Sequence, residues 1–384
     1  MIFRVPELTI EEVAVAKKID ALRATLAYSA SQPRRWFGLL RRNTFVGAVR
    51  GSNSIEGYNV TFEDGVAAVE GLDPLDPKNE AWAAVAGYRM AMSLILQRAD
   101  DNEFSYSADL LKSLHYIMIG HALAKNPGRW RPGAIFVRDG ATGQIAYEGP
   151  PVESVPGLVA ETLNSLNDAA SAAPVMVRAA MAHLNLAMIH PFSDGNGRMA
   201  RALQTLVLAR SGIKAPLFSS IEEWLGRNSR LYYETLSDVG QGAWRPERDT
   251  RPWIRFCLTA HYKQAMIHLR RQRELQKLCD RIEAMVSKLG LPERSVMALA
   301  DAAYGRQLRN PGYRVSADVS VQAAGRDLRF LVKAGLLVPH GDHKARYYLA
   351  ADSLRQIREE VAERRYDEGP FDPAGKLRKA SSGQ

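Results

Sequence analysis

The sequence predicts a mainly α-helical fold that contains one β-hairpin and is followed by a smaller C-terminal domain of a different character. Three observations support this. Apolar residues recur every three or four positions over long segments, two β-rich runs flank one glycine-containing turn, and the pattern changes after Leu291. With 384 residues, 46% of them hydrophobic, the chain can form more than one core, which excludes a short peptide and a disordered tail.

The helical spacing is clearest near the N-terminus. Between Thr9 and Ser29, apolar side chains lie three and four positions apart, and acidic residues stand at the start, where the helix dipole favours them. The same spacing predicts helices over residues 78–98, 107–123, 152–166, 175–189, 199–211, 228–237 and 253–286. Residues 133–147 instead predict a lone β-hairpin inside the helical domain.

The C-terminal part has the order helix, loop, helix and two short strands. These elements are expected over residues 292–303, 304–315, 319–334 and 335–350. The order is typical of a winged-helix domain. The last stretch, from Tyr366, is rich in Gly, Pro, Ser and charge, and we expect it to be disordered.

The second helix of this C-terminal pattern carries a basic stripe. Arg326, Arg329 and Lys333 lie three and four positions apart and therefore share one face. The wing-tip sequence GDHKAR adds His343, Lys344 and Arg346. Such a stripe suits a DNA groove and its phosphates. Docking of a protein or of a second copy is the alternative use of a winged helix.

The charge balance agrees with a basic C-terminal part. The chain has 51 Lys and Arg against 42 Asp and Glu, and residues 251–384 hold 25 of the basic and 15 of the acidic groups, a net charge of +10. A polyanion partner, if there is one, is therefore expected there first. A merely solvated basic surface fits the same numbers.

The cysteines and the apolar runs bear on location. Cys257 and Cys279 cannot form a disulfide framework, and no Cys-x-x-Cys is present for zinc. The N-terminus has acidic residues where a signal peptide needs apolar ones, and no run of about 18 apolar residues occurs. We expect a cytoplasmic protein with no membrane contact.

One segment, HPFSDGNGRMAR at His190–Arg201, differs from all others. Pro191 cannot extend the preceding helix. Gly195 and Gly197 then free the backbone before a new helix begins near Arg198. The first amides of that helix have no acceptor within it and point outward at its positive end, so the loop is suited to an anion.

The same segment holds the side chains that phosphoryl or nucleotidyl transfer needs. His190 can act as a base, Asp194 offers a hard oxygen for Mg²⁺ bound to phosphates, and Arg198 and Arg201 can bind phosphate oxygens. Taken singly, His190 is a helix cap and the glycines are turn residues. Taken together, they favour a catalytic site.

This segment resembles the signature HPFx[D/E]GNGRxxR of the Fic family (filamentation induced by cAMP). Its fixed positions are filled here by His190, Pro191, Phe192, Asp194, Gly195, Asn196, Gly197, Arg198 and Arg201. The resemblance implies a helical core with a β-hairpin flap and transfer of AMP from ATP to a Tyr, Ser or Thr hydroxyl of a protein. Glycine at position 197, where a kinase-like branch carries lysine, favours nucleotidyl transfer.

The resemblance also implies a role for each residue of the signature. His190 is the base, Asp194 holds Mg²⁺, and Phe192 anchors the loop. The nucleotide is bound by Gly195, Asn196, Gly197, Arg198 and Arg201.

Two further regions are similar to family features. The hairpin stands where the family has its flap, so Ile135, Phe136 and Val137 are expected to offer an edge strand to a target protein. The segment NSRLYY resembles the cover of the adenine, which makes Tyr232 and Tyr233 candidate stacking residues. Without the family, adjacent aromatics on a helix are more often core.

The segment SNSIEG at residues 52–57 resembles the inhibitory signature [S/T]xxxE[G/N] of the family. The resemblance implies that the Glu56 carboxylate pairs with Arg201 and takes the arginine that the γ-phosphate would use. An ordinary helix end with a terminal glycine is the alternative.

These predictions give five segments. They are an N-terminal helical region with the inhibitory helix (1–105), the Fic core (106–262), a connecting helix (263–290), the winged helix (291–351), and a helix with the tail (352–384). ATP is the expected substrate and Mg²⁺ the expected cofactor. Self-modification, DNA and a homodimer stay open as partners. The rival functions are a DNA-binding regulator or antitoxin-like protein that uses the nucleotide as a signal, and an enzyme that removes AMP.

Overall fold

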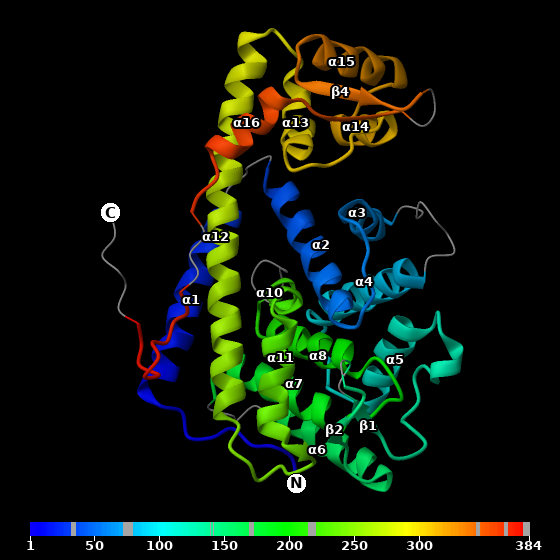
Figure 1. Cartoon of the computed structure of the whole chain (residues 1–384), viewed down its shortest axis with the longest axis vertical. Coiled ribbons are helices and arrows are strands. Elements are labelled where there is room, and N and C mark those ends of the chain that lie inside the picture. Colours follow the sequence, from blue (N-terminus) through cyan, green and yellow to red (C-terminus); the bar gives the residue numbers. More distant parts are fainter. Residues whose placement is uncertain are drawn as a thin grey trace. The chain divides into compact units, whose positions relative to one another are not determined.

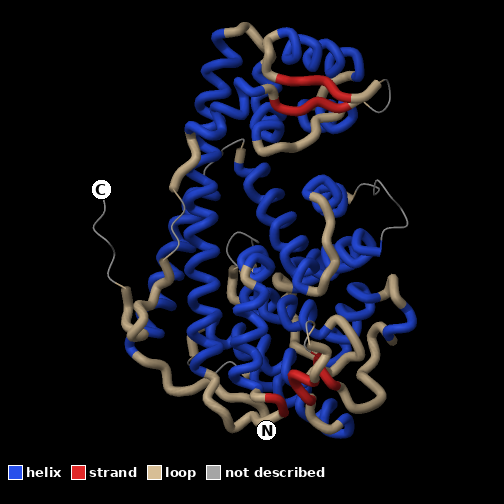
Figure 2. Tube along the Cα trace, in the orientation of Figure 1, coloured by secondary structure: helices blue, strands red, loops and turns tan. Residues whose placement is uncertain are grey.

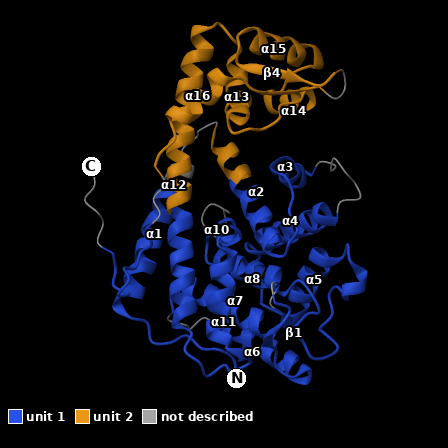
Figure 3. Ribbon diagram, in the orientation of Figure 1, with its two compact units in different colours: residues 1–27, 44–265, 367–384 blue, residues 28–43, 266–366 orange. Residues whose placement is uncertain are grey.

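The computed structural model describes residues 1–31, 36–71, 80–138, 140, 142–168, 173–213, 220–342, 346–364 and 368–378. Helices dominate, and the strands are few and short (Figures 1 and 2). The chain divides into two compact units, one of residues 1–27, 44–265 and 367–384 and one of residues 28–43 and 266–366 (Figure 3). No helix of the described part of the chain is both long and apolar enough to span a membrane.

The first unit is built around two central helices. Helix α7 (Val175–Ile189) and helix α8 (Asn196–Arg210) follow one another along the chain, and most of their side chains are buried. The other helices are α1 (Ile10–Ser31), α2 (Phe37–Ile55), α3 (Phe62–Glu70), α4 (Glu80–Arg98), α5 (Ala108–Ile119), α6 (Val155–Asn167), α10 (Glu222–Arg227) and α11 (Ser229–Gly240). Helix α12 (Arg251–Lys288) begins in this unit and ends in the second, and α1 and α2 also contribute to both. This grouping differs from the five predicted segments, because residues 1–27 and 44–105 belong with the core.

Three helices of this unit were not predicted. Helix α2 contains three glycines and many small polar residues, so its own helix propensity is low. Helix α3 begins at a capping box in which Thr61 and Asp64 bond each other's backbone, and α10 has six residues. Short or weakly periodic helices depend on packing, which the spacing of apolar residues does not report.

A small sheet lies beside these helices. Strand β1 (Phe136–Arg138) pairs antiparallel with β2 (Ile145–Glu148), and β2 pairs in parallel with β3 (Gly242–Ala243). The predicted hairpin is present, but it is not alone, because β3 joins it from a distant part of the chain. The sheet order leaves β1 at an edge.

After α12, the described residues of the second unit form four α-helices and two strands. They are α13 (Val296–Ala303), α14 (Asn310–Ala317), α15 (Val321–Lys333), β4 (Leu337–His340) and β5 (Tyr347–Ala350), followed by α16 (Asp352–Glu360). The predicted loop over 304–315 is therefore partly a helix: Pro311 stands in the first turn of α14, and the buried Tyr313 bonds Asp327. The assignment as a winged helix stays a prediction, and His343 and Lys344 lie outside the described residues.

Part of the C-terminal stretch for which we expected disorder, residues 368–378, has a defined structure, and residues 366, 367 and 379–384 lie outside the described residues. Residues 368–378 form a tight turn in which Phe371 bridges Leu377. The ring of Phe371 lies 5.3 Å from the guanidinium of Arg255 on α12. An aromatic contact of this kind fixes a segment whose composition alone suggests disorder.

Candidate active site

His190 lies at the C-terminal end of α7. Its backbone has φ 51° and ψ 57°, which is the left-handed region, and its amide still bonds the carbonyl of Leu186 at 3.1 Å. A residue other than glycine seldom adopts this conformation, so the surrounding structure must hold it there. The turn directs the chain from α7 into the loop of the signature.

The imidazole of His190 is set up to accept a proton. Its Nδ1 lies 3.1 Å from the carbonyl oxygen of Ala187, which can only accept, so Nδ1 carries the hydrogen and Nε2 the lone pair. Burial lowers the pKa of His190 below its usual value, and the bond to Ala187 opposes this shift only in part. The ring is therefore neutral at pH 7, as a general base requires.

The loop ends where α8 begins. Gly195 has φ 75°, a conformation that glycine adopts readily, and no side chain caps this helix. Helix α8 starts at Asn196, earlier than predicted. The Asn196 side chain accepts a hydrogen bond from the amide of Phe192 and donates one to its carbonyl, both at 2.9 Å, and so closes the loop. The backbone amide of Asn196 lies in the first turn of α8, where the amides have no acceptor within the helix.

His115 supports this loop from α5, and the sequence reasoning missed it. Its Nδ1 accepts from the amide of Gly128 at 2.8 Å, so its Nε2 donates to the carbonyl of Asp194 at 2.9 Å. The ring stacks on Phe192 with centroids 3.8 Å apart. Burial lowers the pKa of His115 to about 4, which keeps the ring neutral. Phe192 is fully buried, as an anchor should be.

Arg131 is a second support that the sequence did not single out. Its Nε donates to the carbonyl of His190 at 3.0 Å, and its amide donates to the carbonyl of Pro191 at 2.8 Å. The same guanidinium also bonds carbonyls on both sides of the hairpin, at Gly133 and Pro150. One buried cation therefore joins the base of the hairpin to the signature loop.

Arg198 and Arg201 are buried on the first turns of α8, with exposed fractions of 1% and 2%. Within the part of the chain that the structure describes, Nε and Nη1 of Arg198 and Nη1 of Arg201 have no hydrogen-bond partner. Buried guanidinium donors without partners are costly. Two such groups beside the open amides of a helix are therefore the donors that a bound polyanion would satisfy.

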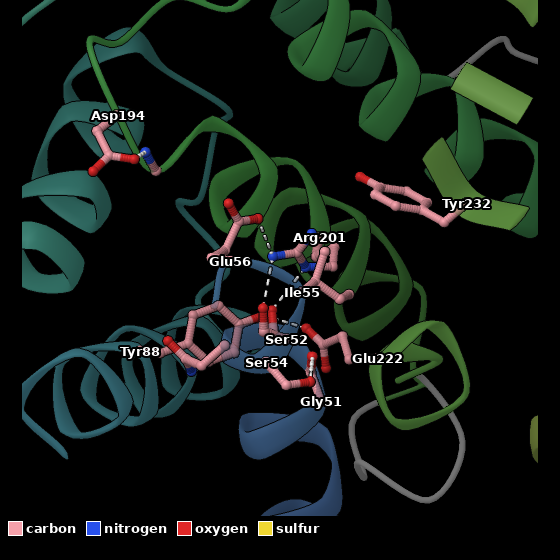
Figure 4. Close-up of polar contacts among 12 residues, drawn as sticks. Gly51, Ser52, Ser54, Ile55, Glu56, Tyr88, Asp194, Arg201, Glu222 and Tyr232 are labelled. Atoms are coloured by element: carbon pink, nitrogen blue, oxygen red, sulfur yellow. Dashed lines mark hydrogen bonds and ion pairs between the residues drawn. The ribbon is translucent and has the colours of Figure 1, made fainter. Parts of the chain in front are cut away.

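Glu56 meets Arg201, as the resemblance implied. Its Oε1 lies 2.7 Å from Nη2 of Arg201, although the two residues are 145 positions apart. Ser52 accepts two further bonds from the same guanidinium, at 2.8 Å each, through its hydroxyl and its carbonyl (Figure 4). Burial opposes the charge of Arg201, but the neighbouring Glu56 carboxylate outweighs this and raises its pKa.

Gly197 explains how Glu56 comes so close to α8. A Cβ atom at position 197 would collide with Oε1 of Glu56 and would lie 3.1 Å from Nη1 of Arg201. Any larger residue here would require the carboxylate of Glu56 to move away from its present position. A second carboxylate, Glu222, accepts from the buried hydroxyl of Tyr88 on the other side of Ser52, and burial raises its pKa (Figure 4).

Asp194 is the candidate metal ligand. Its Oδ1 accepts from the amide of Gly195 at 2.5 Å, and its Oδ2 pairs with Nζ of Lys125 at 2.7 Å. Burial tends to raise the pKa of Asp194, but the bonds from Lys125 and Gly195 lower it below its usual value. The described residues include no group of three His, Cys, Asp or Glu that could hold a metal by themselves. One carboxylate beside an anion site nevertheless fits Mg²⁺, which takes most of its ligands from phosphates and water.

The two candidate adenine residues have different positions. Tyr232 is 1% exposed, its ring packs among His183, Trp253 and Phe256, and its hydroxyl lies 3.0 Å from Nε2 of His183. It is a core residue, so its prediction as a stacking residue is wrong. Tyr233 is 46% exposed, and its hydroxyl donates to the carbonyl of Ile55 at 3.3 Å. Tyr233 alone can meet a ligand.

The residues of the predicted flap lie at the edge of the small sheet. Phe136 and Val137 belong to β1, and Ile135 immediately precedes it and accepts a bond from Gly149 at 3.1 Å. Phe136 is 43% exposed. Within the described residues, β1 pairs only with β2, so one edge of it is open.

The predicted basic stripe lies in the second unit. Arg326, Arg329 and Lys333 are exposed on one face of α15, as their spacing predicted, and Leu328 and Leu331 of the same helix are buried. The buried Asp327 on the same helix accepts from Arg294 and from Tyr313. The helix is thereby fixed to its own unit and presents the stripe to solvent.

Comparison with known proteins places this geometry in a family context. Residues 105–208 match the Fic/DOC family. The chain is 31% identical to the protein adenylyltransferase Fic of Nematostella vectensis over 215 residues. The aligned region covers 53% of this chain and 44% of that protein. It is 30% identical to the protein adenylyltransferase fic-1 of Caenorhabditis elegans over 190 residues, and this aligned region covers 49% of this chain and 33% of that protein. The chain thus spans less than half the length of these relatives.

Solved structures show the same fold. A Fic family protein from Desulfovibrio desulfuricans has a TM-score of 0.56 at 21% identity and covers 90% of this chain and 98% of its own. Fic-1 of C. elegans has a TM-score of 0.54 at 22% identity, and the aligned region covers 67% of this chain and 72% of the Fic-1 chain.

Proposed function

Because the chain carries a Fic/DOC domain over residues 105–208, we propose that it is a protein adenylyltransferase, which moves AMP from ATP to a hydroxyl of a target protein. The observation that carries this proposal is the pair of buried arginines with unpartnered donors beside a neutral histidine and an open helix start. Binding alone would explain the arginines but not the histidine.

The reaction follows from the positions of the chain's own groups. The first amides of α8, with Arg198 and Arg201, bind and orient the triphosphate. Nε2 of His190 takes the proton of the target hydroxyl, whose oxygen then attacks the α-phosphorus in line. A bond from that oxygen to the α-phosphorus forms, the bond from the α-phosphorus to the bridging oxygen breaks, and pyrophosphate leaves.

Asp194 would hold a Mg²⁺ ion on the phosphates. When bound, the ion neutralises phosphate charge. The edge of β1 at Phe136 and Val137 would add a strand of the target, which brings its Tyr, Ser or Thr hydroxyl to His190. Tyr233, on the surface beside Ile55, is the aromatic residue for the adenine.

The pairing of Glu56 with Arg201 fits an autoinhibited resting state. Glu56 uses a donor that the γ-phosphate needs and puts a negative charge beside the triphosphate. ATP would therefore bind with its α-phosphorus out of line for the attack. Removal of AMP from a modified protein, with Glu56 positioning a water molecule, is the alternative direction.

The test compares label transfer from α-labelled and γ-labelled ATP to the protein itself and to a cell extract. Wild type and Glu56→Gly are expected to transfer the α-label only, and His190→Ala is expected to transfer none while it still binds ATP. His340→Ala, on the exposed strand β4 of the second unit, is the matched control. Transfer by His190→Ala at the wild-type rate refutes the base, and transfer of the γ-label shows a kinase.

We also propose DNA as a partner of the second unit, because α15 exposes three basic side chains on one face. DNA binding would favour the rival function, a regulator that uses the nucleotide as a signal, only if no AMP transfer is detected. A location in the cytoplasm, self-modification and a homodimer stay expectations from the sequence.

A further inference from the structure

The residues after Glu56 make a second set of contacts with the site. Tyr58 is half-buried, and its hydroxyl accepts a hydrogen bond from Nζ of Lys125 at 3.0 Å. The guanidinium of Arg198 lies 5.0 Å from the centre of its ring. One tyrosine therefore contacts two of the cations beside the anion site, independently of the pair between Glu56 and Arg201.

Lys125 connects this tyrosine to the candidate metal ligand. Its ammonium lies between the Tyr58 hydroxyl and Oδ2 of Asp194, which is 2.7 Å away. The other carboxylate oxygen of Asp194 accepts from the amide of Gly195. Both oxygens are thus in use, and the positive charge that Asp194 requires comes from the chain itself.

A divalent cation and Lys125 compete for Oδ2 of Asp194, because their like charges repel at such short range. When the cation displaces Lys125 from this oxygen, Tyr58 loses the donor to its hydroxyl. Among the described residues, the other hydrogen bonds of the backbone of residues 56–58 are short-range. The amides of Glu56 and Tyr58 donate to the carbonyl of Asn53, the amide of Gly57 donates to Ser54, and the Asn59 side chain donates to the carbonyl of Gly57.

We propose that Tyr58 and Lys125 form a latch, in which Lys125 neutralises Asp194 and holds residues 56–58 over the nucleotide site. Binding of a divalent cation at Asp194 releases Lys125 and loosens residues 56–58. The latch rests on the proposed function, since it takes Asp194 as the metal ligand. It adds to that function a direct link between metal binding and release of the segment that carries Glu56.

The test is amide hydrogen exchange of residues 53–61, measured by mass spectrometry on the full chain without nucleotide. Lys125→Met removes the charge at nearly constant size, and Tyr58→Phe removes only the hydroxyl. Each is expected to speed exchange at residues 56–58 about tenfold, because a hydrogen bond to a charged group is lost. Lys112→Met and Tyr116→Phe, on α5, are the matched controls and are expected to leave exchange unchanged.

Magnesium ion alone tests the link. In wild type, saturating Mg²⁺ is expected to speed exchange at residues 56–58 about as much as Lys125→Met does. In Lys125→Met and in Asp194→Asn it is expected to have no further effect. Unchanged exchange in both Lys125→Met and Tyr58→Phe overturns the latch. A wild type that does not respond to Mg²⁺, or an Asp194→Asn variant that responds like wild type, overturns the link to the metal.

The outcome is independent of the transfer assay. A protein that transfers no AMP can still show the latch by exchange, and an active enzyme can lack it. Since Lys125 and Asp194 are both about one third exposed, their variants are expected to fold, and near-UV circular dichroism checks this.

Discussion

Basic side chains gather in both compact units, but in opposite surroundings. In the first unit, Arg198 and Arg201 are almost fully buried, and their guanidinium groups keep unpartnered donors among the described residues. In the second unit, Arg326, Arg329 and Lys333 lie open to solvent on α15. Removing a charge from water is costly, whereas leaving it at the surface is not. The buried pair therefore indicates a specific anion, and the exposed stripe indicates only an attraction for polyanions.

The largest expected effect tests the buried pair. In a Glu56→Gly background, Arg198→Ala and Arg201→Ala are each expected to lower AMP transfer about ten- to a hundredfold, because each removes charge-assisted hydrogen bonding to phosphate worth about 1.5–3 kcal/mol. Rates of α-label transfer and calorimetric titration with ATP measure this. Arg230→Ala, an exposed arginine on α11, is the control. Full activity of either variant would show that the buried arginine it lacks contributes no more to AMP transfer than the exposed Arg230.

The next effect concerns the Glu56 carboxylate, which pairs with Arg201. Glu56→Gly is expected to raise self-labelling and target labelling at least about tenfold, or ~1.4 kcal/mol of barrier. Glu56→Asp should give less, since its shorter side chain still partly pairs with Arg201. Arg201→Ala should not activate, because it removes the phosphate ligand together with the inhibited pair. Equal rates in wild type and Glu56→Gly, with both folded and both binding ATP, would show that residues 52–57 are an ordinary helix end.

A smaller effect concerns the buried histidines of the first unit, which should make the free energy of unfolding depend on pH, whereas an exposed histidine should not. Burial lowers the pKa of His183 to about 3 and that of His115 to about 4, against about 6.5 in the unfolded chain. Below pH 6.5 the unfolded chain therefore binds protons that the folded chain does not. As the pH is lowered below about 6.5, the free energy of unfolding should decrease, by up to about 1.4 kcal/mol per pH unit for each histidine.

Urea unfolding at pH 7 and pH 5, followed by tryptophan fluorescence, measures this loss. His183 lies 5.0 Å from Trp253, so the probe reports on the right region. His183→Gln is expected to show a smaller difference between the two pH values than wild type, and His340→Gln the same difference. A stability that does not change over this range would contradict the neutral state of the buried histidines.

The exposed stripe should have no effect on transfer. Replacing Arg326, Arg329 and Lys333 together by Gln is expected to leave AMP transfer unchanged. It should weaken DNA binding and flatten its salt dependence by up to about three units of slope, because fewer counterions are released. Fluorescence anisotropy over a salt series measures this. If wild type has no affinity for DNA at low salt, DNA is not the partner of this stripe, and docking of a protein becomes the favoured hypothesis.

The sequence alone could predict the elements whose signals are local. Helix α7 has the predicted bounds, 175–189, because its apolar spacing is regular and Pro191 stops it. The turn at Gly195 was also predicted from local signals, although α8 begins at Asn196, two residues before the predicted start near Arg198. Helices α2 and α14 were missed, since glycines interrupt both and only packing contacts such as that of Tyr313 fix them.

The tertiary structure decided which residues of the site meet. Tyr232 and Tyr233 are neighbours in sequence, yet one is core and the other is surface, because adjacent side chains on a helix point in different directions and only packing selects the buried one. Asn196 belongs to the signature, and the structure shows that its side chain closes the loop by bonding the backbone of Phe192. Lys125, Tyr58, His115 and Arg131 gave no signal, since each acts through a partner far along the chain. Local sequence fixes backbone geometry, whereas a contact between distant side chains depends on how all the helices pack together.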